Sequence, residues 1–236
     1  TTSNIAAAFL PRKADAIIPH GIDTMRYHPP IEGKANAWRA LNLGGEFGIG
    51  IFGRIRPQKG VDILIDAMLE ILKQNRNCGA TVVIVGETTK KYVRYLDSLK
   101  KRIRDSGFEE RFLFLGKLPF EDIPKLFRGM SIVAALSRNE GFGLTVLEAM
   151  SSGAAVIASE AGAWPDIIKG DNYGKLVPIN DLRGTISALN DLMSVPPKDL
   201  ERMGMEGHKL VLDNYRLETE AQTLVNFYQN IQANGN

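Results

Sequence analysis

Two loops of this 236-residue chain carry charged side chains at a spacing that suits the binding of a diphosphate. The first loop runs from Gly53 to Gly60, between an apolar segment and an amphipathic one, and holds Arg54 and Lys59. Cations beside a helix N-terminus, whose free N–H groups also attract negative charge, form a phosphate-binding site. We therefore expect Arg54 and Lys59 to face the same anion.

The second loop is rich in glycine and leads to a carboxylate at Glu148. It begins with Glu140-Gly141-Phe142-Gly143-Leu144. If a helix begins near Gly143, its free amides can hold an anion while Glu148 presents a carboxylate about one turn in. A carboxylate can accept from both hydroxyls of a ribose, and Glu140 can bind hydroxyls of a second sugar. A diphosphate between two sugars describes a nucleotide sugar.

Each of these side chains has a simpler explanation when it is considered alone. Arg54 and Lys59 could be solvated surface charges, because lysine and arginine are mostly exposed. Glu148 could be an ordinary helix residue, and Glu140 a partner of the helix dipole. Their coincidence on two loops of one sheet edge is what favours a binding site.

The two loops can meet only if each of them follows a buried strand. Near-continuous apolar runs, typical of parallel strands buried on both faces, occur at Phe47–Phe52, Thr81–Val85, Arg111–Leu115, Ser131–Leu136 and Ala154–Ala158. Segments of helical spacing alternate with them, and three more helices are expected over Leu182–Met193, Lys198–Leu212 and Leu217–Ile231. The pattern predicts an α/β fold with a Rossmann-like parallel sheet of at least five strands and helices on both faces. Ligands of such sheets bind beyond the carboxyl ends of the strands.

Composition excludes several other classes of protein. The chain is 44% hydrophobic and 24% charged, as in ordinary globular domains rather than disordered or fibrous chains. A net charge of +2 argues against a nucleic-acid partner. The single cysteine, Cys78, excludes an internal disulfide and favours the cytoplasm. No run reaches the roughly 18 apolar residues of a membrane span, and the absence of an initiator Met suggests a fragment of a longer protein.

Several competing motifs fail on their context or are missing. The segment Gly48–Gly53 fits G-x-G-x-x-G, but its glycines fall inside an apolar run, so we interpret them as strand residues and not as a dinucleotide-binding turn. Neither the phosphate loop of nucleoside triphosphatases nor the G-x-S-x-G elbow of hydrolases occurs. No Asp-x-Asp pair is present and the three histidines lie far apart, so we expect no metal site. Arg54 and Lys59 would then stabilise the leaving group in place of a metal ion.

Taken together, the chain resembles the C-terminal domain of family 4 retaining glycosyltransferases, which have the GT-B fold. Glu140 and Glu148 make the E-x7-E motif, and Gly53–Gly60 resembles the phosphate loop of the family. The segment Ile18–Asp23 resembles its inter-domain strand and hinge, although His20 stands where Asn is common. Ser159–Asp166 resembles the loop that comes after the E-x7-E motif in this family. The match runs almost from end to end.

The resemblance implies a role for each candidate residue. Arg54 and Lys59 would neutralise the donor diphosphate, Glu148 would bind the nucleotide ribose, and Glu140 would contact the transferred sugar. Backbone for the sugar and phosphates would come from Gly141, Phe142, Gly143 and Leu144, and the base and ribose pocket would be lined by Gly86, Lys117 and Leu118. Transfer would retain the anomeric configuration and use no metal cofactor.

The resemblance extends to bacterial lipopolysaccharide-core mannosyltransferases and glucosyltransferases, which favours mannose from GDP-mannose as the donor. UDP-glucose or UDP-N-acetylglucosamine, and a nucleotide-sugar-binding module without catalysis, are the alternatives. The acceptor would be a glycolipid or saccharide. An acceptor in the inner membrane would bring the enzyme into peripheral contact with its cytoplasmic face.

The same resemblance divides the chain into four parts. Residues 1–19 would be a remnant of the N-terminal domain and inter-domain strand, and residues 20–46 a linker. Residues 47–215 would form the nucleotide-sugar-binding domain, and residues 216–236 a helix that returns toward the missing N-terminal domain. Because much of the acceptor site would lie on that missing domain, we expect the chain alone to bind nucleotide but to transfer sugar poorly.

Overall fold

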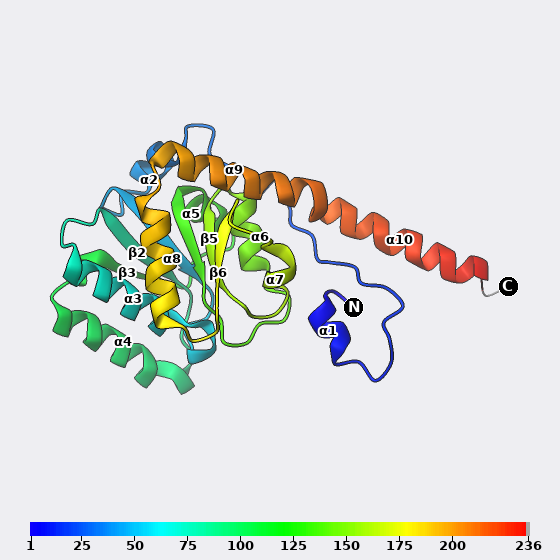
Figure 1. Ribbon diagram of the computed structural model, residues 1–236, viewed down its shortest axis with the longest axis horizontal. Helices are drawn as coiled ribbons and strands as arrows, with labels where there is room; N and C mark the ends of the chain where they lie inside the picture. The colour runs from blue at the N-terminus through cyan, green and yellow to red at the C-terminus, as the bar shows by residue number, and fades with distance from the viewer. Residues whose placement is uncertain (235–236) are drawn as a thin grey trace.

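Six parallel strands form one sheet, in the order β3-β2-β1-β4-β5-β6 (Figure 1). The computed structural model describes residues 1–234. The strands are β1 Phe47–Phe52, β2 Ala80–Val85, β3 Phe112–Gly116, β4 Met130–Ala135, β5 Ala155–Ser159 and β6 Gly174–Val177. The five predicted strands and the parallel α/β class are confirmed, with strand ends that differ by one residue at most. The short edge strand β6 was not predicted.

Helices connect successive strands and continue beyond the sheet. Those that lie between strands are α3 Val61–Gln74, α4 Val93–Ser106, α5 Ile123–Gly129, α6 Leu144–Ser151 and α7 Trp164–Ile167. The sheet is preceded by α1 Asn4–Ala8 and α2 Lys34–Leu41, and followed by α8 Leu182–Ser194, α9 Pro197–Asn214 and α10 Leu217–Asn234. Single 3-10 turns occur at η1 Pro57–Lys59, η2 Lys90–Tyr92 and η3 Glu109–Arg111. The three helices predicted after residue 180 are confirmed.

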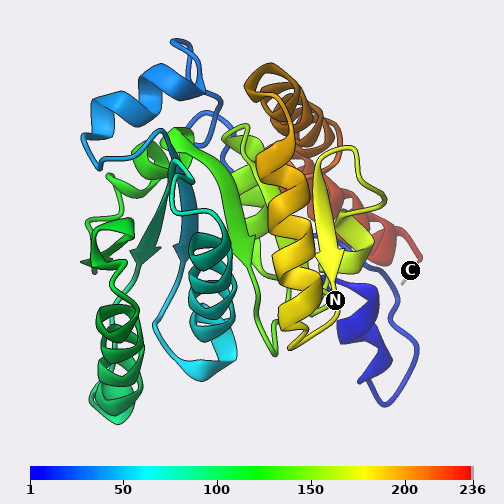
Figure 2. The same cartoon turned by 60° about the vertical axis from the view of Figure 1, so that its left-hand side comes forward.

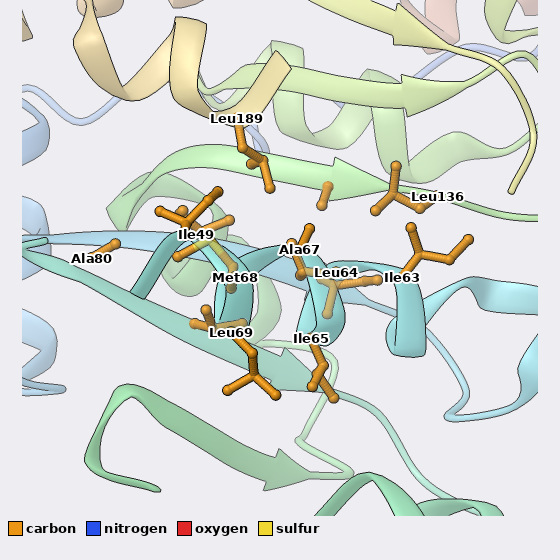
Figure 3. Close-up of a cluster of buried hydrophobic side chains, with 14 of the residues drawn as sticks. Ile49, Ile63, Leu64, Ile65, Ala67, Met68, Leu69, Ala80, Leu136 and Leu189 are labelled. Carbon is orange, nitrogen blue, oxygen red and sulfur yellow. The ribbon is translucent and has the colours of Figure 1, made fainter. Parts of the chain in front are cut away.

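Helices lie on both faces of the sheet, as predicted (Figure 2). Two hydrophobic clusters lie beneath them, one on each face. Helices α3, α4 and α8 cover one face, and α2, α5, α6, α7 and α9 contribute to the other. Figure 3 shows part of the first cluster, where Met68 of α3 and Leu189 of α8 gather around Ile49 of β1. All three side chains are fully buried, so the central strand is held by apolar contacts that favour the folded state.

The glycines of β1 serve packing rather than nucleotide binding. A Cβ atom added to Gly48 would lie 2.4 Å from the ring of Trp38, and one added to Gly50 would lie 2.9 Å from Met130 Cγ. Large side chains therefore lie directly against the strand backbone. Gly48 and Gly50 of the G-x-G-x-x-G pattern are thus strand residues, as predicted, whereas Gly53 follows the end of β1.

Residues 20–46, which we expected to form a linker of little periodicity, contain the packed helix α2. This helix was not predicted. Trp38 of α2 is 2% exposed, and α2 packs against α5. Lys34, at the start of α2, is buried, and its Nζ donates to the carbonyls of Phe127, Arg128 and Ser152. These carbonyls belong to the C-terminal ends of α5 and α6, so one ammonium group satisfies acceptors at the ends of two helices.

Helix α10 continues the line of α9 and extends away from the sheet (Figure 1). Its start is tied to the segment before α2, because Ile22 N donates to Tyr215 O and Leu217 N donates to Ile22 O, over 2.7 and 3.1 Å. Val225, Tyr228 and Ile231 are about half exposed or more. The predicted terminal helix is confirmed up to residue 234, and residues 235 and 236 lie outside the described residues. None of the helices that the structure describes combines the length and apolarity needed to cross a membrane.

The contact between β1 and Trp38 predicts the effect of a single added methyl group. Gly48→Ala should lower the free energy of unfolding by about 1–3 kcal/mol, because the central strand cannot move away from the indole ring. Urea denaturation followed by circular dichroism measures this change. Gly141→Ala is the control, because its added Cβ meets no atom within 4 Å. Equal losses of stability in the two variants would contradict this packing explanation.

Candidate functional site

The candidate site lies at the carboxyl edge of the sheet, between β1 and β4. The chain continues from β1 to its neighbour β2 on one side, and from β4 to its neighbour β5 on the other side. The direction in which strands are added to the sheet therefore reverses between β1 and β4. Open α/β sheets bind ligands in the crevice at such a point. The loops that follow β1 and β4 touch there, because Arg138 N donates to Gln58 O over 2.8 Å.

An ion pair joins the two loops that the sequence singled out. Lys59 Nζ lies 2.5 Å from Glu140 Oε2, and the two side chains are only 20% and 16% exposed. Ser137 Oγ donates to the same carboxylate oxygen over 3.2 Å. The side chain of Lys59 passes beside Gly53, where an added Cβ would lie 3.6 Å from Lys59 Cε. The structure therefore brings together a cation and a carboxylate that are 81 residues apart in the sequence.

A second, bidentate pair joins the loop after β4 to the first turn of α3 and was not predicted from the sequence. Arg138 Nη1 and Nη2 donate to Asp62 Oδ1 and Oδ2 over 2.9 and 2.7 Å. Tyr95 Oη donates to Asp62 Oδ1 over 2.8 Å, and Arg138 also donates to the carbonyl of Pro57. Burial alone would raise the pKa of Asp62, but the hydrogen bonds from Arg138 and Tyr95 outweigh it and lower that pKa. The acidic residue in the first turn of α3 was the available sequence signal.

The glycine-rich loop is held in a backbone conformation that larger residues rarely adopt. Gly143, the N-cap of α6, has φ +77°, and an added Cβ would lie 2.3 Å from Trp164 Nε1, which donates to Gly143 O over 3.0 Å. A Cβ on Gly162, where φ is +57°, would lie 2.5 Å from Gly141 O. Helix α6 begins at Leu144, as predicted, so the N–H groups of its first turn lack intrahelical acceptors. Gly141 and Leu144 are exposed, whereas the side chain of Phe142 is buried.

Glu148 lies one turn into α6 and is partly buried. Burial raises the pKa of its carboxyl group, and the neighbouring Tyr27 hydroxyl and Arg26 guanidinium offset this in part. The Tyr27 side chain is 4% exposed, and its hydroxyl has no hydrogen-bond partner among the described residues. Tyr27 and Arg26 were not predicted as site residues, because they belong to the segment treated as a linker.

The remaining predicted residues follow other strands of the same sheet edge. Arg54 is exposed and is not paired with Glu140 in the part of the chain that the structure describes. Gly86 follows β2 with φ +146°, and a Cβ there would lie 1.9 Å from Gly53 O. Lys117 is exposed and lies 3.7 Å from a carboxylate oxygen of Glu87, whereas Leu118 is partly buried against the second cluster.

The residues that the structure describes include no group of three or more His, Cys, Asp or Glu side chains that could hold a metal ion. Two pairs of opposite charge lie at this edge, Lys59 with Glu140 and Arg138 with Asp62. The cation of such a pair can leave its carboxylate and bind an incoming anion instead. The free N–H groups of α6 lie on the same side of the sheet.

The Asp62–Arg138 pair predicts a pH dependence of stability. The pKa of Asp62 in the folded chain is below its ordinary value of 3.8, so the stabilisation is complete above that pH and is lost as the pH falls through the folded value. Asp62→Asn should therefore reduce the acid-induced fall in the free energy of unfolding below about pH 4. Urea denaturation across pH 2–7 measures this, and an unchanged acid limb would contradict the assignment. Asp15→Asn is the matched control, because it removes the carboxylate of the exposed Arg12–Asp15 pair.

Comparison with known proteins identifies the family of the chain. A family model described as "Glycosyl transferases group 1" matches residues 46–194. The chain is 36% identical over 230 residues to the lipopolysaccharide core biosynthesis mannosyltransferase LpcC of Rhizobium leguminosarum bv. viciae, covering 98% of this chain. It spans 63% of the length of that relative.

Two solved structures show the same fold. The C-terminal domain of the group 1 glycosyl transferase LpcC from Francisella tularensis is 35% identical with a TM-score of 0.77, over 84% of this chain and 100% of that one. Anabaena Alr3699/HepE, solved with UDP and glucose, is 24% identical with a TM-score of 0.80, over 91% of this chain and 57% of that one. The fold, the family model and the sequence identity agree: this chain belongs to the group 1 glycosyl transferases, and its sheet is that of a GT-B C-terminal domain.

Proposed function

We propose that this chain is the donor-binding part of a retaining glycosyltransferase that moves mannose from GDP-mannose to a lipopolysaccharide-core or related glycolipid acceptor. The observation that carries the proposal is the half-buried Lys59–Glu140 pair beside the N-terminus of α6. The printed name of the Rhizobium relative, a lipopolysaccharide core mannosyltransferase, supports the sugar and the acceptor class. UDP-glucose or UDP-N-acetylglucosamine in the same site is the alternative donor.

The donor diphosphate would bind between Lys59 and the first turn of α6. The Lys59 side chain is 20% exposed, so its charge is less screened by water than that of a surface lysine. Arg54, on the same loop and exposed, would reach the diphosphate from solvent. Fixed cations and free N–H groups would stabilise the charge that develops on the departing nucleoside diphosphate.

The two carboxylates would bind the two sugars. Glu148 is partly buried, and accepting hydrogen bonds from a ribose diol would favour its ionised form and offset the cost of its burial. Glu140 is released for the transferred sugar when Lys59 turns to the diphosphate, and Ser137 Oγ still donates to it. The two glutamates would thus lie on either side of the diphosphate, one for each sugar.

Three further residues would surround the nucleoside. Gly86, Lys117 and Leu118 follow β2 and β3, so the base would lie on that side of the diphosphate. The acceptor would bind mainly to the part of the protein that corresponds to the remaining length of the relatives. We place the reaction on the cytoplasmic side of the inner membrane, with the enzyme in peripheral contact with its acceptor.

Nucleotide binding by this chain tests the donor site. Isothermal titration calorimetry should show tighter binding of GDP than of UDP. Lys59→Ala and Glu148→Gln should each weaken GDP binding by about tenfold or more, because each removes a charge-assisted hydrogen bond. Lys101→Ala is the matched control, since Lys101 pairs with Asp105 on the exposed side of α4.

The outcomes separate the site from the donor. Tighter binding of UDP would overturn the assignment of GDP-mannose but keep the site, provided that Lys59→Ala and Glu148→Gln still weaken it. A Lys101→Ala variant that loses as much affinity as Lys59→Ala would contradict the proposed position of the diphosphate. So would binding that both site substitutions leave unchanged.

A further inference from the structure

His20 contacts helix α10 through a carboxylate that uses both of its oxygens. His20 Nδ1 lies 2.9 Å from Glu220 Oε1, and Gly21 N donates to Glu220 Oε2 over 2.7 Å. Glu220 is 17% exposed and lies in the first turn of α10, whereas His20 is 43% exposed. Because a carboxylate only accepts, His20 must donate through a proton on Nδ1. The hydrogen bond therefore fixes the orientation of the imidazole ring.

The same imidazole contacts the glycine-rich loop. The rings of His20 and Phe142 lie edge to face, with centroids 5.1 Å apart and planes at 88°. Phe142 is 9% exposed and stands between Glu140 and the first residue of α6. A single side chain thus contacts both the start of α10 and the loop that carries Glu140.

The backbone next to His20 cannot move independently of α10. A Cβ added to Gly21 would lie 2.3 Å from Arg216 O, so the two chain segments are in direct contact. Ile22 is hydrogen-bonded on both sides to the residues that lead into α10. A displacement of the start of α10 would therefore move His20, and His20 would press on or leave Phe142.

We propose that His20 is a positioning residue that couples helix α10 to the donor loop Glu140–Gly143. The inference rests on the proposed function, in which this loop binds the transferred sugar and the diphosphate. His20 acts through two contacts of different chemistry, a hydrogen bond to Glu220 and an aromatic contact to Phe142. Both contacts are required, since the hydrogen bond to Glu220 orients the imidazole ring against Phe142 and the ring contact transmits that position to the loop.

Two substitutions separate the contacts, and the chain contains its own reporter groups. His20→Asn retains an N–H donor for Glu220 but loses the ring, and His20→Phe retains the ring but loses the donor. The indole N–H of Trp164 donates to Gly143 O and reports on the loop. The indole N–H of Trp38 donates to Gly45 O, outside this loop, and reports on the rest of the domain. These are the two tryptophans of the chain.

Hydrogen exchange of the two indole groups, followed by NMR without nucleotide, tests the coupling. Both variants should speed the exchange of Trp164 by about twofold to tenfold, as expected for loss of an edge-to-face pair or of the bond that orients it. The exchange of Trp38 should not change. GDP affinity should fall by a similar factor. His28→Asn, a matched histidine substitution whose ring contacts Pro29 O and Arg128, should change neither.

The result that would overturn the coupling is an unchanged Trp164 exchange in either variant, because both contacts are required. Equal acceleration of Trp164 and Trp38 would also overturn it, since this indicates general destabilisation of the domain. The exchange readout needs no ligand. A chain that shows the Trp164 effect but fails to bind GDP would therefore retain the coupling and contradict the proposed function.

Discussion

Half-buried charges at the junction of β1 and β4 must be paired, and this requirement organises the carboxyl edge of the sheet. Removing a charge from water is costly unless a partner of opposite sign compensates it. Lys59 with Glu140 and Arg138 with Asp62 meet the requirement. The first pair joins the loop after β1 to the loop after β4, and the second joins the first turn of α3 to the loop after β4. The Arg138–Asp62 pair is bidentate, and Tyr95 donates a further hydrogen bond to Asp62, so we expect this pair to stay in place when a ligand binds. The Lys59 pair is simpler, because Lys59 Nζ contacts a single carboxylate oxygen of Glu140.

Close approach of backbone segments is the second constraint, and glycine makes it possible. Added Cβ atoms would lie 2.0 Å from Leu136 O at Gly60 and 1.9 Å from Gly53 O at Gly86. Each of these glycines has a positive φ, which other residues adopt at a cost. The loops can therefore approach one another closely enough for side chains on different strands to share one site. The glycines of β1 solve a different problem, because they admit Trp38 and Met130 to the face of the strand.

The parts of the fold that were predicted from sequence are those with local signals. Five strands appear as apolar runs because both of their faces are buried, whereas β6 has four residues, two of them only partly buried. The N-cap residue of helix α2 is Gly33, which provides no side-chain cap. Lys34, the first residue of the helix, is buried, and lysine is a residue type that is rarely buried. Glu140 and Lys59 were identified because glycine spacing and loop position mark them. Arg138 and Asp62 lie 76 residues apart, and Tyr27, a neighbour of Glu148, belongs to a segment without periodicity, so only the folded chain shows that these residues are neighbours.

A crystal structure of this chain with GDP would test the account most directly, because it shows where the diphosphate binds. We expect the diphosphate to lie between Lys59 and the first turn of α6, with Lys59 Nζ turned from Glu140 toward a phosphate oxygen and with the ribose bound to Glu148. The Asp62–Arg138 pair should remain as it is in the free chain. A diphosphate bound elsewhere, with the Lys59–Glu140 pair unbroken, would contradict the central claim.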